Sequence, residues 1–349
     1  MAKNFKLSDA IGTPDLVVEE TERGLTVTYV APGHYDKLDF DQPIDAIDPK
    51  ALEGVTADDF SFPTNIKHAV VPEGVEIVTR HQFDGCEKLQ TVELSSTLKE
   101  ISRLTFAGLN SLEHVNIPEG VEVIDHHAFF NCHSLERIVI PEGVDYIGKS
   151  AFKGCKNLKE IMLPSTLRYI EEGAFENCEF LERIVVPEGV EKVNWSAFAN
   201  CKNLKEIVLP PTIHVPSHNT YFGFGQDAFK GCESLERIVI PENVEKIFEC
   251  TFADCKNLKE VILPSTLWSI EAGAFYGCES LERIVIPEGI NEIDGSAFEN
   301  CNNLKEVEVS TECKFYCYEI FGIDKIKHYS PAENGADISI IKKDDCPEL

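Results

Sequence analysis

Residues 141 to 163 read PEGVDYIGKSAFKGCKNLKEIML, and the chain repeats this stretch many times. The stretch ends in Leu158-x-x-Ile161-x-Leu163, an apolar alternation typical of a short β-strand, and a proline follows it. No window keeps helical spacing for the roughly ten residues of an ordinary helix, although the Ser-Ala-Phe segment could form a single turn. The unit therefore predicts one short strand and one tight turn.

The unit returns every 23 residues through residues 72 to 309. One step, from Phe198 to Phe229, is 31 residues long, which indicates an insertion of 8 residues. A unit this short cannot bury its own apolar face, so its copies must stack into a solenoid with a continuous interior. The repeated phenylalanines that count ten turns are Phe83, Phe106, Phe129, Phe152, Phe175, Phe198, Phe229, Phe252, Phe275 and Phe298.

The phrase IPEGVxxIGxxAFxxCxxLxxIxLP, which spans Ile140 to Pro164, resembles the BspA-like class of leucine-rich repeats. The resemblance covers about two-thirds of the chain. It implies a β-rich α/β fold: a curved leucine-rich-repeat solenoid of ten turns with a parallel sheet, capped at both ends. It also implies binding of other macromolecules, often in surface or secreted adhesion proteins, and it supplies no catalytic residue.

Three regions follow from the extent of the repeat. Residues 1–71 lack it and contain the alternating stretch LTVTYV at 25–30, so we expect an N-terminal cap or small β-rich module. Residues 72–309 are the predicted solenoid, with the insertion near 214–226. Residues 310–349 are the predicted C-terminal cap and tail.

The composition excludes some classes of function. The 349 residues carry 32 Lys plus Arg against 60 Asp plus Glu, a formal net charge of −28, which disfavours nucleic acid and anionic membranes as partners. No apolar run reaches the roughly 18 residues of a membrane span, so no membrane insertion is expected. The N-terminal sequence MAKNFKLSDA does not resemble a signal peptide, which predicts a cytoplasmic protein. If a leader was removed, the family resemblance favours the cell surface or secretion.

Two charged columns are predicted on the strand side of the stack, because the units alternate between two types. Opposite charges would then lie next to each other in each column, which stabilises the register and opposes a slip by one unit. A charged binding surface is the alternative interpretation. The Glu/Lys column is Glu136, Lys159, Glu182, Lys205, Glu236, Lys259, Glu282 and Lys305; the Arg/Glu column is Arg137, Glu160, Arg183, Glu206, Arg237, Glu260, Arg283 and Glu306.

An apolar strip is predicted beside these columns, two residues after the Arg or Glu of each strand. By strand alternation its side chains face solvent, and the column becomes polar at Glu93 and Asn116 before it and at Glu308 after it. Such a strip is typical of a partner-binding site, although β-branched residues also favour strands for their own sake. The strip is Val139, Met162, Val185, Val208, Val239, Ile262 and Val285.

The insertion offers a second candidate contact. It reads IHVPSHNTYFGFGQDAF over residues 213–229, and Pro216 replaces the usual isoleucine, which predicts an interrupted strand. We expect Tyr221, Phe222 and Phe224 to contact a partner from a protruding loop. The alternative is that these aromatic residues fold back to cover the broken edge of the solenoid.

Nine of the 13 cysteines occupy one position of the repeat, where the second unit has Leu109. This exchange for leucine predicts an apolar slot with small buried thiols, and nine copies do not suit a nucleophile. Stacked side chains point in parallel, which disfavours disulfides, so many free thiols and a reducing compartment are expected. Cys313, Cys317, His328 and Cys346 could bind zinc, but their spacing fits no known finger and a capping segment is preferred. No metal or other cofactor is predicted.

These observations predict a non-catalytic scaffold that binds macromolecules, by protein–protein interaction or adhesion, through the strand face. No set of nucleophile, base and orienting group stands out, so an enzyme is not expected. The expected partner is a protein or an extended peptide with a basic or neutral face. There are two alternatives: a structural subunit that multimerises, and a carbohydrate-binding surface protein. Self-association of the chain is also possible.

Overall fold

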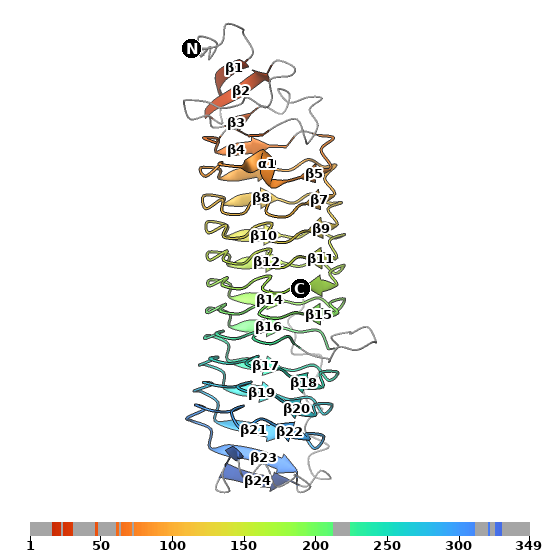
Figure 1. Cartoon of the computed structure of the whole chain (residues 1–349), viewed down its shortest axis with the longest axis vertical. Helices are drawn as coiled ribbons and strands as arrows, with labels where there is room; N and C mark the ends of the chain where they lie inside the picture. Colours follow the sequence, from red (N-terminus) through yellow and green to blue (C-terminus); the bar gives the residue numbers. More distant parts are fainter. Residues whose placement is uncertain are drawn as a thin grey trace.

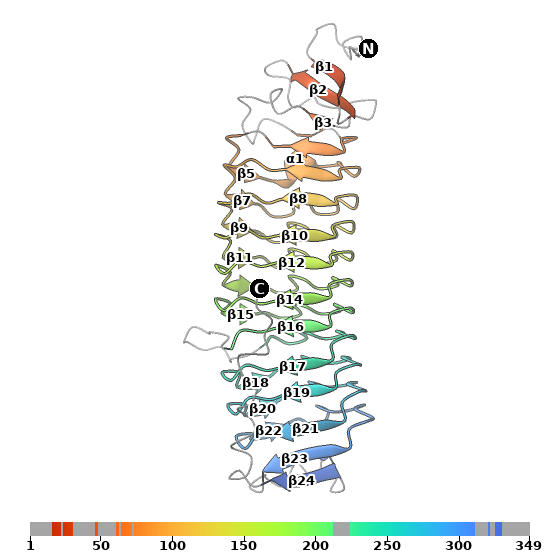
Figure 2. The same ribbon diagram turned by 180° about the vertical axis from the view of Figure 1, so that it is seen from behind.

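The computed structural model describes residues 16–21, 24–30, 46–47, 61–62, 64–71, 73–211, 224–310, 320–321 and 325–329. Figure 1 shows an elongated stack of turns with two rows of short strands, and Figure 2 shows the same stack from behind. Parallel strands 23 residues apart in sequence pair in register along both rows. The predicted parallel β-solenoid is confirmed.

The first row, which we call the strand face, carries the charged columns and the strip. In its central strands the middle residue is buried and its two neighbours point outward, as the alternation predicts. The strands are β4 (His68–Val70), β6 (Thr91–Glu93), β8 (His114–Asn116), β10 (Arg137–Val139), β12 (Glu160–Met162), β14 (Arg183–Val185), β16 (Glu206–Val208), β17 (Arg237–Val239), β19 (Glu260–Ile262), β21 (Arg283–Ile286), β23 (Glu306–Ser310) and β24 (Ile326–Tyr329).

The second row, which we call the second face, consists of two-residue strands. The odd-numbered strands from β5 to β15 form one six-stranded parallel sheet, and β18, β20 and β22 form a separate three-stranded one. No ladder joins β15 to β18 among the described residues. Pro216, on which the predicted interruption rests, lies outside them. The strands are β5 (Ile77–Val78), β7 (Glu100–Ile101), β9 (Val123–Ile124), β11 (Tyr146–Ile147), β13 (Tyr169–Ile170), β15 (Lys192–Val193), β18 (Lys246–Ile247), β20 (Ser269–Ile270) and β22 (Glu292–Ile293).

A single column of phenylalanine rings fills the interior between the two faces. Neighbouring ring centroids lie 4.8 to 5.7 Å apart, and the central rings are nearly parallel. The column continues to Phe62 before the first predicted turn and to Phe321 after the last. The stack of turns therefore extends beyond residues 72–309 at both ends.

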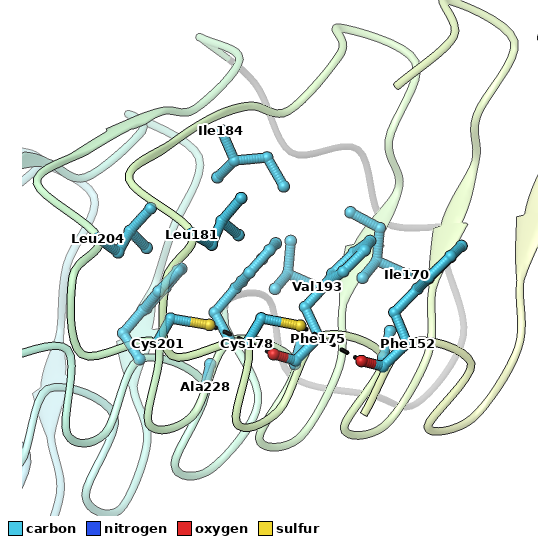
Figure 3. Close-up of a cluster of buried hydrophobic side chains, with 14 of the residues drawn as sticks. Phe152, Ile170, Phe175, Cys178, Leu181, Ile184, Val193, Cys201, Leu204 and Ala228 are labelled. Carbon is cyan, nitrogen blue, oxygen red and sulfur yellow. Dashed lines mark hydrogen bonds between the residues drawn. The ribbon is translucent and has the colours of Figure 1, made fainter. Parts of the chain in front are cut away.

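The cysteine column lies beside the rings. Figure 3 shows Cys178 and Cys201 donating from their thiols to the carbonyl oxygens of Phe152 and Phe175 in the preceding turns, at 3.3 and 3.2 Å. Each cysteine of the column makes the same bond across one turn. The same carbonyl oxygens also accept the backbone amides of Cys155 and Cys178 at 3.1 Å, so each thiol adds a second bond that links one turn to the next.

The segment before the first cysteine of the column forms one helical turn, α1 (Arg80–Phe83), whereas later repeats have a series of turns there. The amide of Thr79 donates to Oε1 of Gln82 at 2.7 Å, which closes the start of α1. Before the solenoid, β1 (Leu16–Thr21) and β2 (Gly24–Val30) form an antiparallel hairpin. This hairpin joins β3 (Ala46–Ile47) and then β4, so it ends the sheet of the strand face.

Candidate binding surface on the strand face

From β10 to β23 the strand face is divided into pairs of strands. Hydrogen-bonded ladders join β10 to β12, β14 to β16, β17 to β19 and β21 to β23. In each pair an Arg of the Arg/Glu column lies directly opposite a Glu of the next strand. Between residues 137 and 309, excluding the undescribed 212–223, no ladder joins one pair to the next.

The ion pairs of both columns follow the same division. Arg183 Nε lies 2.9 Å from Glu206 Oε2, and Lys205 Nζ lies 3.0 Å from Glu182 Oε2. Matching contacts of 2.7 to 3.9 Å occur in the other three pairs. The predicted contacts between opposite charges are thus confirmed within each pair.

The ion pairs do not run unbroken along either column. Among the described strand-face residues, no ion pair of either column crosses from β12 to β14, from β16 to β17 or from β19 to β21. A side chain that leans toward one neighbour moves away from the other, so from β10 to β19 each column charge pairs with one partner. At the end of the row, Glu306 contacts both Arg283 and Lys327. The columns are therefore a series of neutral pairs rather than one unbroken ladder.

The apolar strip lies beside these pairs on the outer side of the strands. Val139, Met162 and Val239 are exposed at 47%, 48% and 40%, and the other four members are half-buried. The strip stops at Glu308, which accepts from Arg283 at 2.6 Å. The structure thus brings all seven predicted residues onto one face, in seven consecutive strands from β10 to β21.

The insertion does not supply the predicted contact at Phe224. This side chain is fully buried and packs edge-on against Phe229, with 5.1 Å between ring centroids. Its backbone also bridges to Val193 of β15. The prediction that Phe224 contacts a partner is therefore wrong, and the alternative, that the segment folds back over the broken edge, holds for this residue. Tyr221 and Phe222 lie outside the described residues.

Three exposed aromatic residues were not predicted, and one of them, Tyr276, is 38% exposed. Phe180 is 48% exposed just before β14, and Trp195 is 57% exposed just after β15. A sequence signal exists for the latter two, because both replace polar residues at their repeat positions, such as Asn157 and Lys149. The backbone at Gly225 passes so close that a Cβ there would clash with the backbone nitrogen of Trp195. Trp195 therefore lies against the segment that follows the insertion.

Most of the buried thiols are poor nucleophiles. Burial raises the pKa of Cys86, Cys155 and Cys201 to about 12, so these thiols stay protonated and weakly nucleophilic at neutral pH. The cysteines in the described part of the chain form no disulfide with one another. No group of three or more His, Cys, Asp or Glu side chains could hold a metal ion there. The cysteines proposed as an alternative zinc site, Cys313, Cys317 and Cys346, lie outside the described residues, as does the side chain of His328.

The fold and this face define a class of protein, the parallel β-solenoids built from leucine-rich repeats. A model of the BspA type leucine rich repeat region matches residues 53–147, 122–224 and 222–339, with six copies. The chain belongs to this family. Its members are typically scaffolds without enzymatic activity.

Solved structures with a similar fold include bacterial leucine-rich repeat proteins. One, from Bacteroides ovatus, is 22% identical, with a TM-score of 0.46 and coverage of 90% of this chain and 98% of that one. Another, a leucine rich cell surface protein from Faecalibacterium prausnitzii, is 21% identical, with a TM-score of 0.46 and coverage of 95% and 96%. No curated protein matches the chain. Among the described residues, no helix is long and apolar enough to cross a bilayer.

Proposed function

We propose that the chain is a non-catalytic scaffold that binds a protein or an extended peptide along the apolar strip. The observation that carries this proposal is the alignment of seven apolar side chains, three of them 40% exposed or more, on consecutive strands of one face. Apolar side chains collected in one line on a surface are typical of interaction sites, whereas scattered ones are not.

The columns beside the strip contribute specificity. Their charges neutralise each other within strand pairs, so they attract a partner weakly from a distance. A partner whose charges are misaligned would place like charges together and bind less well. Because the whole chain carries −28, a partner with a basic or neutral face is favoured on encounter.

A binding role without catalysis also agrees with the chemistry of the repeat. The conspicuous nucleophiles are thiols that are buried and bonded to carbonyl oxygens in turn after turn. Catalysis requires a single nucleophile or base in reach of a substrate. The exposed polar side chains of the strand face are engaged in ion pairs with each other instead.

The strip can be tested by adding charge to it. The double substitution Val185→Glu and Val208→Glu is expected to weaken capture of a partner at least tenfold, because two carboxylates would lose their hydration in the complex. Capture from a cell extract, followed by affinity measurement with the purified partner, checks this result. The double variant must first show the circular dichroism spectrum of the wild type.

The matched control adds charge to the second face. Ile77→Glu with Lys192→Glu alters exposed positions there, and Ile77 is 43% exposed, much like the strip residues. This control is expected to bind as the wild type does. Equal binding by the strip variant would refute the proposal. If only the removal of residues 217–222, which spares buried Phe224, abolishes binding, the site lies in the insertion.

A further inference from the structure

The two charged columns of the strand face carry no net charge in a strongly acidic chain. Over β10 to β23, the Glu/Lys and Arg/Glu columns together contain eight acidic and eight basic side chains. The formal net charge of −28 therefore belongs entirely to residues outside these columns. When two copies of the chain approach, their repulsion is smallest if these faces meet.

The alternation of charges makes this face complementary to a reversed copy of itself. We count the strands of this face from β10 as the first to β23 as the eighth. Odd positions in this count (β10, β14, β17 and β21) carry an Arg in the Arg/Glu column, and even positions (β12, β16, β19 and β23) carry a Glu. If a second copy lies antiparallel, with the twofold axis along the strands, odd strands of one copy can face even strands of the other. Each Arg then faces a Glu, and each Glu of the Glu/Lys column faces a Lys.

The same symmetry places the apolar strip against itself. A twofold axis parallel to the strands keeps each side chain at the same position along the strand, so strip meets strip. The ion-paired side chains are still available to the other copy, since Arg237 and Glu260 remain 47% and 55% exposed. A shift of one strand would set like charges opposite each other, so the allowed registers lie two strands apart.

We propose that two copies of this chain associate strand face to strand face, antiparallel, through the apolar strip and the two columns. This inference rests on the proposed function, because it names an occupant of the same surface. Seven strands at about 4.8 Å and a width of four residues give roughly 450 Å² per copy. That is below the ~800 Å² per partner of a standard interface, so the dimer is weak and reversible.

Sedimentation velocity on the full chain tests this proposal, with a reducing agent present to exclude disulfide dimers. The wild type is expected to change from monomer to dimer as its concentration rises through the micromolar range. The exchange Arg137→Glu with Glu160→Arg keeps an ion pair within β10 and β12 but reverses its sign. It is expected to raise the dimer dissociation constant at least tenfold, and so is Val185→Glu with Val208→Glu.

A matched exchange on the second face is the control. Lys149→Glu with Glu172→Lys reverses an ion pair of 2.8 Å there and is expected to leave the dimer unchanged. If the first exchange fails to fold, Glu136→Lys with Lys159→Glu reverses the other column on the same two strands. It carries the same expectation.

Two results would overturn the proposal. One is a wild type that stays monomeric at every concentration; this would leave the proposed function intact, since capture of another protein is measured separately. The other is a dimer that the strand-face exchange does not weaken, which would show that the interface lies elsewhere or lacks the antiparallel charge match. A dimer lost in the strand-face variants and kept in the control supports the proposal.

Discussion

Replacing Phe175 with alanine is expected to lower the free energy of unfolding by about 3 to 5 kcal/mol, as for other buried phenylalanines. The ring is fully buried and lies 5.5 Å from the ring of Phe152 and 5.3 Å from that of Phe198. Its removal leaves a cavity in the middle of the column, where no neighbouring turn has a spare side chain to fill it. Denaturant unfolding followed by circular dichroism measures the loss.

The chain provides a matched control five residues away. Phe180 has the same side chain but is 48% exposed, so Phe180→Ala is expected to change the free energy of unfolding by less than about 1 kcal/mol. A large loss for Phe180→Ala with a small one for Phe175→Ala would contradict the assignment of the core.

Alkaline pH is expected to unfold the protein sharply. Burial raises the pKa of seven column thiols, those of Cys86, Cys132, Cys155, Cys178, Cys201, Cys232 and Cys255. Their folded pKa lies above the unfolded value, so the folded state keeps protons that the unfolded state loses. Their contribution to stability is complete below about pH 8.5 and decreases as pH rises toward the folded pKa.

The size of this effect follows from the number of thiols. Each one removes about 1.4 kcal/mol of stability per pH unit within that window, so seven together remove roughly 10 kcal/mol per unit. The whole stability of a domain is commonly about 5–15 kcal/mol. A loss of roughly 10 kcal/mol per pH unit above about pH 8.5 exhausts it within one to two units, so we expect cooperative unfolding between about pH 9.5 and 10.5. Circular dichroism during a pH titration measures the midpoint.

Removing thiols provides the control for this titration. Cys155→Ala with Cys201→Ala eliminates two groups whose pKa is about 12. The dependence of unfolding free energy on pH above 9 should then become shallower by about 2.7 kcal/mol per unit. An unchanged slope would show that these thiols do not titrate with unfolding. Leu109, buried in the same slot, indicates that an apolar side chain is tolerated there.

Much of the fold could be predicted because the same pattern of apolar residues occurs in ten repeats. A phenylalanine every 23 residues can be buried only if the turns stack in register, and the rings do stack. Strand alternation likewise placed the strip on the outer side of the strands, opposite buried residues such as Ile138 and Ile161. The fold followed from these patterns, and the family followed from the resemblance of the repeated phrase to BspA-like repeats.

The partner of each charged side chain could not be predicted in the same way, because suitable partners lie on both adjacent strands. Alternating signs give each charge two suitable partners, and the sequence does not say which one Glu160 takes; the structure pairs it with Arg137. The insertion has no repeated template, so its aromatic residues could not be divided into buried and exposed ones. Phe224 was therefore assigned to the wrong side.

Met162 provides the most direct test of the central claim, that partners bind along the apolar strip. It is 48% exposed in the middle of the strand face, and the only other methionine of the chain is Met1. Oxidation by dilute hydrogen peroxide, followed by mass spectrometry of the peptides, reports the accessibility of each sulfur. In a complex with a captured partner, oxidation of Met162 should slow at least fivefold while that of Met1 serves as the internal reference. Equal oxidation of Met162 in the free and the bound protein would contradict binding at the strip.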